Sequence, residues 1–176
     1  MSSSIRLFVQ LDLYLGGQLE IRTGQLHYLR NVMRLGLGAE FLLFNGQNGE
    51  FLGEIVDIKK RSILVSIKDQ VRVQYPDSDI WLLFSPIKRS GVNFIIEKAT
   101  ELGVTKLLPV LTDYTNTDRV NTDRLNTIAI EAAEQCRRLT VPDIAEPKLL
   151  NEVLDQWNPL RRLLVMDETL ATIEGV

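Results

Sequence analysis

The clearest pattern of apolar and polar positions lies between Ile80 and Thr115. It opens with an apolar run, Ile80 to Ser85, whose length suits a strand buried on both faces. After a break at 86–91, apolar residues recur at helical spacing: Val92, Ile95, Ile96, Ala99 and Leu102. Gly103 can end this helix in a left-handed conformation, and 106–111 is a second apolar run. The pattern predicts a βαβ unit with two parallel strands.

Parallel sheets of this kind bind ligands beyond the carboxyl ends of their strands. Here those ends are Pro86–Ser90 and Thr112–Thr117, so we expect function at this edge. Lys88 and Arg89 follow the first strand and precede the predicted helix, a position that suits an anionic group such as phosphate. The sequence contains no Walker loop, no G-x-G-x-x-G and no G-x-S-x-G, the usual nucleotide and hydrolase motifs.

The first seventy residues show short apolar stretches separated by glycine-rich or basic turns. This pattern favours a small antiparallel barrel with one inserted helix. The predicted strands are 5–11, 18–21, 40–45, 50–57 and 62–67. The inserted helix is expected from about Gln25 to Leu35, with Thr23 as its N-terminal cap.

A basic stripe is predicted on this inserted helix, because His27, Arg30 and Arg34 are spaced to share one face. One interpretation is an ordinary solvated surface, which most exposed helices carry. The other is a face that contacts RNA phosphates, extended by Arg6 and by the turn 59–61. Spacing alone leaves both interpretations open.

Apolar periodicity is lost over 71–79, which contains Pro76, so we place a domain boundary there. The two predicted domains are residues 1–72 and 79–176. In the second, a polar loop ends near Asn121 and a helix runs to about Leu139, followed by a third helix at 149–157 and a third strand at 163–166. The core face predicted for the helix before Leu139 is Leu125, Ile128, Ala129, Ala132, Ala133 and Cys136.

Composition narrows the class of protein. The 176 residues are 45% hydrophobic and 24% charged, which is ordinary for a folded domain. We expect neither a secretory signal nor a membrane span, because no apolar run is long enough. A single Cys136 excludes an internal disulfide and suits the cytoplasm, and one Cys with one His argues against a zinc site, so we expect no metal.

Charge is distributed unevenly about the net value of −3. Residues 1–74 carry nine Lys/Arg and seven Asp/Glu, whereas 75–176 carry eleven and sixteen. The two parts therefore have net charges of +2 and −5. This asymmetry is mild, so nucleic-acid binding needs local geometry as well as charge.

Several strings together resemble one known family. HYLRNVMRL, FNGQNGEFLGEI, IIEKATELGV followed by KLLPVLT, and IAIEAAEQCRRLTVPDI resemble the 16S rRNA (uracil-N3) methyltransferases of the SPOUT superfamily. The matches are in the same order as in the family and cover nearly the whole chain. The resemblance implies an N-terminal PUA-like β-barrel that binds RNA. It also implies a Rossmann-like α/β methyltransferase domain with a trefoil knot that binds S-adenosylmethionine.

One departure from the family limits what the resemblance implies. Family members continue with a Gly-Pro-Glu-Gly-Gly loop and a Leu-Arg-x-Glu-Thr segment, which form most of the knot and the cofactor pocket. Neither occurs in this chain. We therefore expect these 176 residues to lack most of the pocket and to be inactive alone, and we assign no cofactor-binding residue.

The reaction implied is transfer of a methyl group from S-adenosylmethionine to uracil N3 in 16S rRNA. N3 carries a proton on the pairing edge of the base, so the base must be unpaired and its proton accepted. Candidate catalytic residues are Glu97, Glu131 and Arg138; Glu134 lies in the same family-like segment. The expected RNA-binding residues are Arg6, His27, Arg30, Arg34, Lys88 and Arg89.

The resemblance further implies 16S rRNA or the small ribosomal subunit as partner, a homodimer for the complete protein, and no membrane. Two other hypotheses about function remain open. A non-catalytic rRNA-binding module would have the barrel and the α/β half without a pocket. A flavodoxin-like enzyme for a small phosphorylated ligand would explain Lys88 and Arg89 but would leave the barrel without a role.

Overall fold

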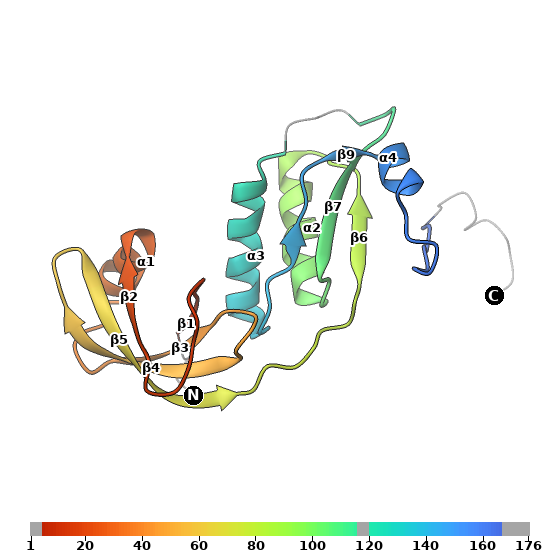
Figure 1. The fold of residues 1–176 in the computed structure, drawn as a ribbon. Helices are drawn as coiled ribbons and strands as arrows, with labels where there is room; N and C mark the ends of the chain where they lie inside the picture. Colours follow the sequence, from red (N-terminus) through yellow and green to blue (C-terminus); the bar gives the residue numbers. More distant parts are fainter. Residues whose placement is uncertain (1–4, 116–119, 167–176) are drawn as a thin grey trace, which may run out of the picture.

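Five strands form the N-terminal half of the chain in the computed structural model, which describes residues 5–115 and 120–166. They are β1 (Arg6–Phe8), β2 (Gln18–Arg22), β3 (Glu40–Phe44), β4 (Glu50–Ile58) and β5 (Ser62–Arg72). Their order in the sheet is β1-β3-β4-β5-β2, antiparallel except for the parallel pair β1–β3. Figure 1 shows the sheet curling into a barrel-like shape. The turns expected between the predicted strands 40–45, 50–57 and 62–67 are confirmed, whereas the parallel pair β1–β3 departs from the antiparallel pattern expected.

Alternation of apolar and polar residues explains the core of this domain. Phe41 and Leu43 of β3, Ile55 of β4 and Val65 of β5 point inward and are almost fully buried. Leu29, from the segment inserted between β2 and β3, closes the same cluster. Burial of one face of each strand fixes the register of the sheet.

The inserted helix differs from the prediction. A single α-helical turn, α1 (Thr23–His27), leads into a π-helical segment, Tyr28–Val32, and the helix ends there rather than at Leu35. Thr23 is the first helical residue, with φ of 51°, and Arg22 occupies the N-cap position without a side-chain bond. Arg34 lies beyond the helix with φ of 55°. The helical spacing assumed for the basic stripe therefore does not hold.

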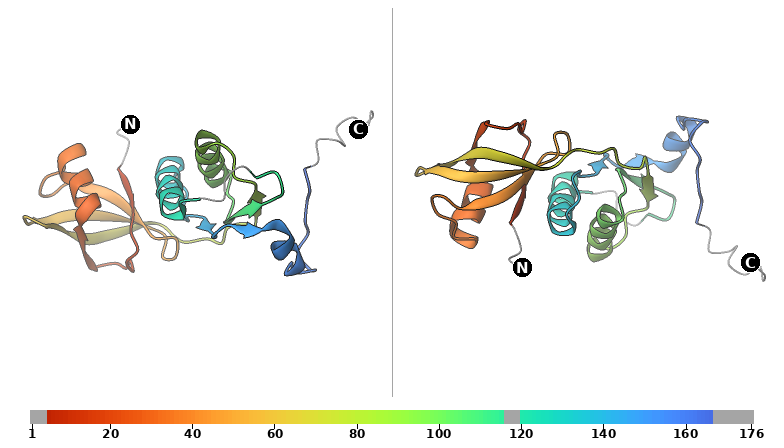
Figure 2. Two further views of the ribbon diagram at one scale, coloured as in Figure 1. Left: turned by 90° about the horizontal axis from the view of Figure 1, so that it is seen from above. Right: turned by 90° about the horizontal axis from the view of Figure 1, so that it is seen from below.

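The second half is a parallel sheet of β6 (Trp81–Phe84), β7 (Lys106–Leu111), β8 (Asp143–Ile144) and β9 (Lys148–Leu149). β6 lies on one side of β7, while β8 and β9 both pair with β7 in parallel. The helices are α2 (Arg89–Glu101), α3 (Thr122–Cys136) and the short α4 (Leu150–Asp155). Figure 2 shows α2 and α3 on one face of the sheet and α4 on the other. The predicted βαβ unit is confirmed.

Packing of α2 follows its apolar stripe. Val92, Ile96 and Ala99 are buried against the sheet, as the spacing predicts. Leu102, in contrast, is 80% exposed, because the helix has ended one residue earlier and Gly103 turns the chain at φ of 91°. The helix therefore ends at Glu101, two residues before the predicted glycine, and Leu102 is not part of the core.

Helix α3 begins where the polar loop predicts. The Asn121 side chain accepts a hydrogen bond from the backbone N–H of Arg124 at 2.9 Å, which caps the first turn. Leu125, Ala129, Ala132 and Ala133 are buried. Cys136 is exposed, because the helix ends there and Arg137 takes a left-handed conformation with φ of 61°.

The strand predicted at 163–166 is wrong. These residues form no strand, and Leu164 and Met166 are 70% and 89% exposed. The third strand position is taken instead by β8 and β9, which pair with β7 soon after α3. Within the described ranges, no helix is both long and apolar enough to cross a membrane, and no cluster of metal-ligating side chains occurs.

Candidate functional site

The loops that follow β6 and β7 meet at the carboxyl edge of the sheet. The hydroxyls of Ser85 and Thr115 lie 2.8 Å apart, which joins the end of β6 to the loop after β7. The Thr115 hydroxyl also accepts a hydrogen bond from the backbone N–H of Thr112 at 2.8 Å. Asn116 and Thr117, the rest of the predicted edge, lie outside the described residues. Ser85 lies just before the predicted segment Pro86–Ser90, and Thr112 and Thr115 lie in the second predicted segment, so this contact is made beside the predicted edge.

Two helices point their N-termini toward this edge (Figure 1). Lys88 is the N-cap of α2, and its side chain makes no capping bond; Arg89 is the first helical residue. Both are exposed. Arg124 in the first turn of α3 donates to the Asn93 side chain of α2 at 2.7 Å, which ties the two helix starts together. Free backbone N–H groups and the positive end of the helix dipole favour an anion at such a position.

Three residues of this edge were not among the predicted site residues. Ser85 ends an apolar strand, Thr115 lies in the polar loop after the next strand, and Arg124 follows a capping Asn at the start of a helix. A hydroxyl directly after a buried strand is a weak signal, since such residues also end many strands without a function.

The carboxylates predicted as catalytic candidates lie away from this edge. Glu97 is about 12 Å along α2 from Arg89, and Glu131 is about 13 Å along α3 from Thr122, at a rise of ~1.5 Å per residue. Glu97 forms an ion pair with Lys98 at 2.8 Å, and Glu131 is exposed. Neither carboxylate converges with the hydroxyls at the strand ends.

Glu134, further along α3, is partly buried at the junction with the barrel. Its carboxylate accepts a hydrogen bond from the backbone N–H of Phe8 at 2.9 Å. Burial raises the pKa of Glu134 above its ordinary value, and the Phe8 N–H and the charge of Arg6 only partly offset this. This carboxylate joins the two halves of the molecule rather than facing the strand ends.

Arg138 and Arg6 have structural roles that remove them from the predicted functional surfaces. Arg138 is 9% exposed and donates to the carbonyl oxygens of Thr100 and Val104 at 3.1 and 2.6 Å, and to Asp77 at 2.7 Å. Arg6 is 6% exposed and is bound by Glu50 and by backbone carbonyls of α3. Sequence spacing could not show that either guanidinium is enclosed.

The three basic residues predicted to form the stripe on the inserted helix are exposed to solvent. His27, Arg30 and Arg34 are all exposed, and the Asn31 amide lies 2.7 Å from Nδ1 of His27. Among the basic residues of this barrel surface, Arg30 and Arg34 make no ion pair within the described part of the chain. Their binding to RNA stays a prediction.

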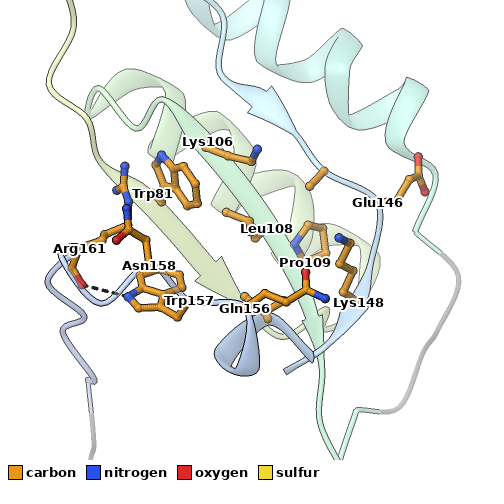
Figure 3. A pocket seen from close by; sticks show the side chains of 12 residues that line it. Trp81, Lys106, Leu108, Pro109, Glu146, Lys148, Gln156, Trp157, Asn158 and Arg161 are labelled. Atoms are coloured by element: carbon orange, nitrogen blue, oxygen red, sulfur yellow. Dashed lines mark hydrogen bonds between the residues drawn. The ribbon is translucent and has the colours of Figure 1, made fainter. Parts of the chain in front are cut away.

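A cavity of about 370 Å³ lies on the other face of the sheet, between β7, β9 and the segment after α4 (Figure 3). Trp81 forms one wall, and its ring lies edge-to-face with that of Trp157 at a centroid distance of 6.1 Å. The Arg161 guanidinium lies 3.8 Å and the Lys106 ammonium 5.0 Å from the centre of the Trp81 ring. The cavity thus combines aromatic walls with several cations.

The two halves of the chain match two different family models. A family model described as an RNA methyltransferase domain matches residues 74–174, and one described as an RNA methyltransferase PUA domain matches residues 21–68.

Two curated relatives share one name. The ribosomal RNA small subunit methyltransferase E of Rickettsia conorii is 35% identical over 156 residues, which cover 88% of this chain and 64% of that protein. Its namesake from Synechocystis is 30% identical over 155 residues, covering 86% and 50%. The chain therefore spans one half to two thirds of the length of these relatives.

A solved structure shows the same fold. The crystal structure of the ribosomal RNA small subunit methyltransferase E from Neisseria gonorrhoeae, bound to S-adenosyl methionine, superposes with a TM-score of 0.76. Its sequence identity is 23%, and the match covers 89% of this chain and 66% of that one.

Proposed function

Because this chain belongs to the RNA methyltransferase family that includes the ribosomal RNA small subunit methyltransferases E, we propose that it contributes RNA binding and positioning to S-adenosylmethionine-dependent methylation of 16S ribosomal RNA. The reaction we propose is methylation at N3 of a uracil. The chain consists of a PUA-like domain followed by a SPOUT methyltransferase domain. We further propose that it acts in the cytoplasm, on the small ribosomal subunit, as part of a homodimeric enzyme.

The observation that carries this proposal is the convergence at the carboxyl edge. Two helix starts, the cations of Lys88 and Arg89, and the hydroxyls of Ser85 and Thr115 gather at one end of a parallel sheet. Helix N-termini and cations bind phosphate, and hydroxyls donate to base or sugar oxygens. An RNA strand with one unpaired base suits this combination.

The reaction itself is mainly a matter of position. Uracil N3 lies on the pairing edge, so the base must leave the duplex before it can be methylated. Lys88 and Arg89 would hold the flanking phosphates and fix the strand while the base is extruded. In-line placement of the methyl carbon and N3 then lowers the barrier. We assign no proton acceptor among Glu97, Glu131 and Glu134, since none of them lies at the edge.

The cavity in Figure 3 is a poor match for S-adenosylmethionine. Its sulfonium is a cation, which carboxylates, carbonyl oxygens or aromatic faces stabilise and which neighbouring cations disfavour. The cavity in Figure 3 instead places Lys106, Lys148 and Arg161 around its aromatic walls, against one carboxylate, Glu146. We therefore derive no chemical step through the cofactor from these residues.

This misfit favours a second candidate function for the chain alone, a module that binds ribosomal RNA without modifying it. Calorimetric titration with S-adenosylmethionine separates the two. Binding at micromolar concentration would support a complete cofactor site, whereas no heat above dilution would support the module.

The direct test of the proposed reaction uses small subunits that lack the modification. We expect the chain to bind their 16S rRNA but to transfer no labelled methyl group alone. A chimera that adds the part of the Rickettsia conorii relative lying beyond its match should form N3-methyluridine, and Lys88→Ala with Arg89→Ala should reduce it about tenfold or more, as for loss of charged contacts. Absence of rRNA binding, or methylation of another atom, would contradict the proposal.

A further inference from the structure

The junction between the two domains is made by barrel side chains that bind the C-terminal end of α3. Arg6 of β1 donates at 2.7, 2.9 and 2.9 Å to the carbonyl oxygens of Ala133, Glu134 and Arg138. Arg72, the last residue of β5, donates to the carbonyl oxygen of Arg137 at 2.9 Å. Carbonyls at the end of a helix have no partner within it and carry its negative dipole, so cations stabilise them.

One buried carboxylate holds both arginines in place. Glu50 of β4 accepts from Nε of Arg6 at 2.5 Å and from Nε of Arg72 at 2.8 Å. The side chains of Arg6 and Glu50 are each only 4% exposed. The Arg6 guanidinium also lies 4.3 Å from the centre of the Phe44 ring. A planar guanidinium loses little side-chain entropy for each hydrogen bond that it forms. Because each of these two guanidinium groups is bonded on more than one side, we expect the arrangement to be rigid.

Two further contacts between the domains lie beside this network. The backbone N–H of Phe8 donates to the Glu134 carboxylate at 2.9 Å. The turn at Gly46 comes so near the loop after α3 that a Cβ atom there would lie 3.7 Å from Cα of Thr140. Contacts on several sides of the helix end oppose a hinge motion between barrel and sheet.

We propose that Arg6, Glu50 and Arg72 form an interdomain clamp that positions the barrel relative to the carboxyl edge of the sheet, so that one RNA is bound by both. This rests on the proposed function. The clamp fixes the Arg30 and Arg34 surface relative to Lys88 and Arg89. An RNA that reaches both surfaces then loses no free energy to ordering the domains. Arg6 and Arg72 are positioning residues, which do not themselves touch the RNA.

The geometric part of the proposal is tested without RNA. Spin labels on Lys60→Cys in the barrel and Leu102→Cys at the end of α2, with Cys136→Ser, report the distance between the domains; all three positions are exposed. We expect one narrow distribution, broadened by Arg6→Leu or Arg72→Gln and unchanged by the control Lys68→Gln on the barrel surface. Arg72 is one-third exposed, so its variant remains informative if Arg6→Leu does not fold. Narrow, unshifted distributions in the folded clamp variants would overturn the clamp.

The functional part is tested with two RNA probes. One is a long structured fragment of 16S rRNA, and the other is a single-stranded oligonucleotide too short to reach both surfaces. Arg72→Gln should weaken binding of the long probe about tenfold, equivalent to ~1.4 kcal/mol, and leave that of the short probe unchanged. Equal losses on both probes would overturn the positioning role. Failure of the unaltered chain to bind either probe would overturn the proposed function, whereas the distance measurement would still decide on the clamp.

Discussion

The guanidinium of Arg6 lies 2.7 Å from the carbonyl oxygen of Ala133, a residue 127 positions further along the chain. A side chain of the barrel's first strand thus completes the end of a helix in the other domain. The carboxylate of Glu50 neutralises this buried cation. Breaking such a pair leaves an uncompensated charge in the interior, which costs more than the pair contributes when intact.

Replacement of Glu50 by Gln should destabilise the protein by about 3 kcal/mol or more at neutral pH, because two guanidinium groups lose their counter-charge. Burial raises the pKa of Glu50, but hydrogen bonds from Arg72 and Arg6 outweigh it and hold the pKa below the ordinary value of 4.5. The stabilisation is therefore present above pH 4.5 and is lost as the pH falls through the lower folded-state pKa. Denaturant unfolding at a series of pH values measures it.

The matched control is Glu54→Gln on the same strand. Glu54 pairs with Lys68 at the surface, and exposed pairs of this kind are worth roughly 0–1 kcal/mol. If the difference in unfolding free energy between the two variants stays constant down to pH 2, ionised Glu50 does not stabilise the fold.

Glu134 should show the opposite dependence on pH. Its pKa is raised by burial, so its ionised form is disfavoured in the folded state, and protonation stabilises the fold as the pH falls. Glu134→Gln keeps an oxygen that can accept from the Phe8 N–H. We expect this variant to be more stable than the original chain at pH 7, with the advantage shrinking in acid. A variant that is less stable at pH 7 would mean that the charge of Glu134 is needed by Arg6.

Ile96 tests how the apolar stripe of α2 packs. Its side chain is fully buried, so Ile96→Ala should cost about 2–5 kcal/mol of unfolding free energy. The control Leu102→Ala, at the exposed end of the same helix, should change it by less than about 0.5 kcal/mol. Similar losses at both positions would contradict the burial described for α2.

Elements with strong local patterns were predictable from the sequence. The stripe of α2, its terminal Gly103 and the start of α3 after a polar loop are each set by residues a few positions away, and the structure has all three. The hairpin between β3 and β4 also follows from its turn residues.

What was missed depends on contacts between distant residues. Strands β8 and β9 have two residues each, too few for a period, and form only because β7 offers its edge. From the sequence we assigned Arg6 to a basic surface, because nothing near it in the sequence shows that Glu50 and α3 enclose it. The apolar run at 163–166 has the composition of a strand, but no described strand pairs with it.

Arg30 and Arg34 are the residues by which the barrel is predicted to hold RNA phosphates. Replacing both by Glu should weaken binding to rRNA fragments and flatten its dependence on salt, since the slope reports the number of phosphates neutralised. Lys148→Glu with Arg162→Glu makes the same charge change at exposed positions of the other domain. If the dependence of binding on salt is unchanged in the Arg30 and Arg34 variant, this surface is an ordinary solvated surface that does not contact RNA phosphates.

Apolar side chains after α4 should make a protein of these 176 residues self-associate. Leu160, Leu164 and Val165 are 93%, 70% and 75% exposed, and β6 has no partner on its outer edge among the described strands. Exposed apolar side chains and an unpaired strand edge each promote association between chains. We expect the sedimentation coefficient to rise with concentration and the dye ANS to bind. Leu164→Lys with Val165→Lys should reduce both effects, whereas Val56→Lys, on the exposed side of β4, should not. A monomer at all concentrations, with no ANS fluorescence, would show that these surfaces are covered within one chain.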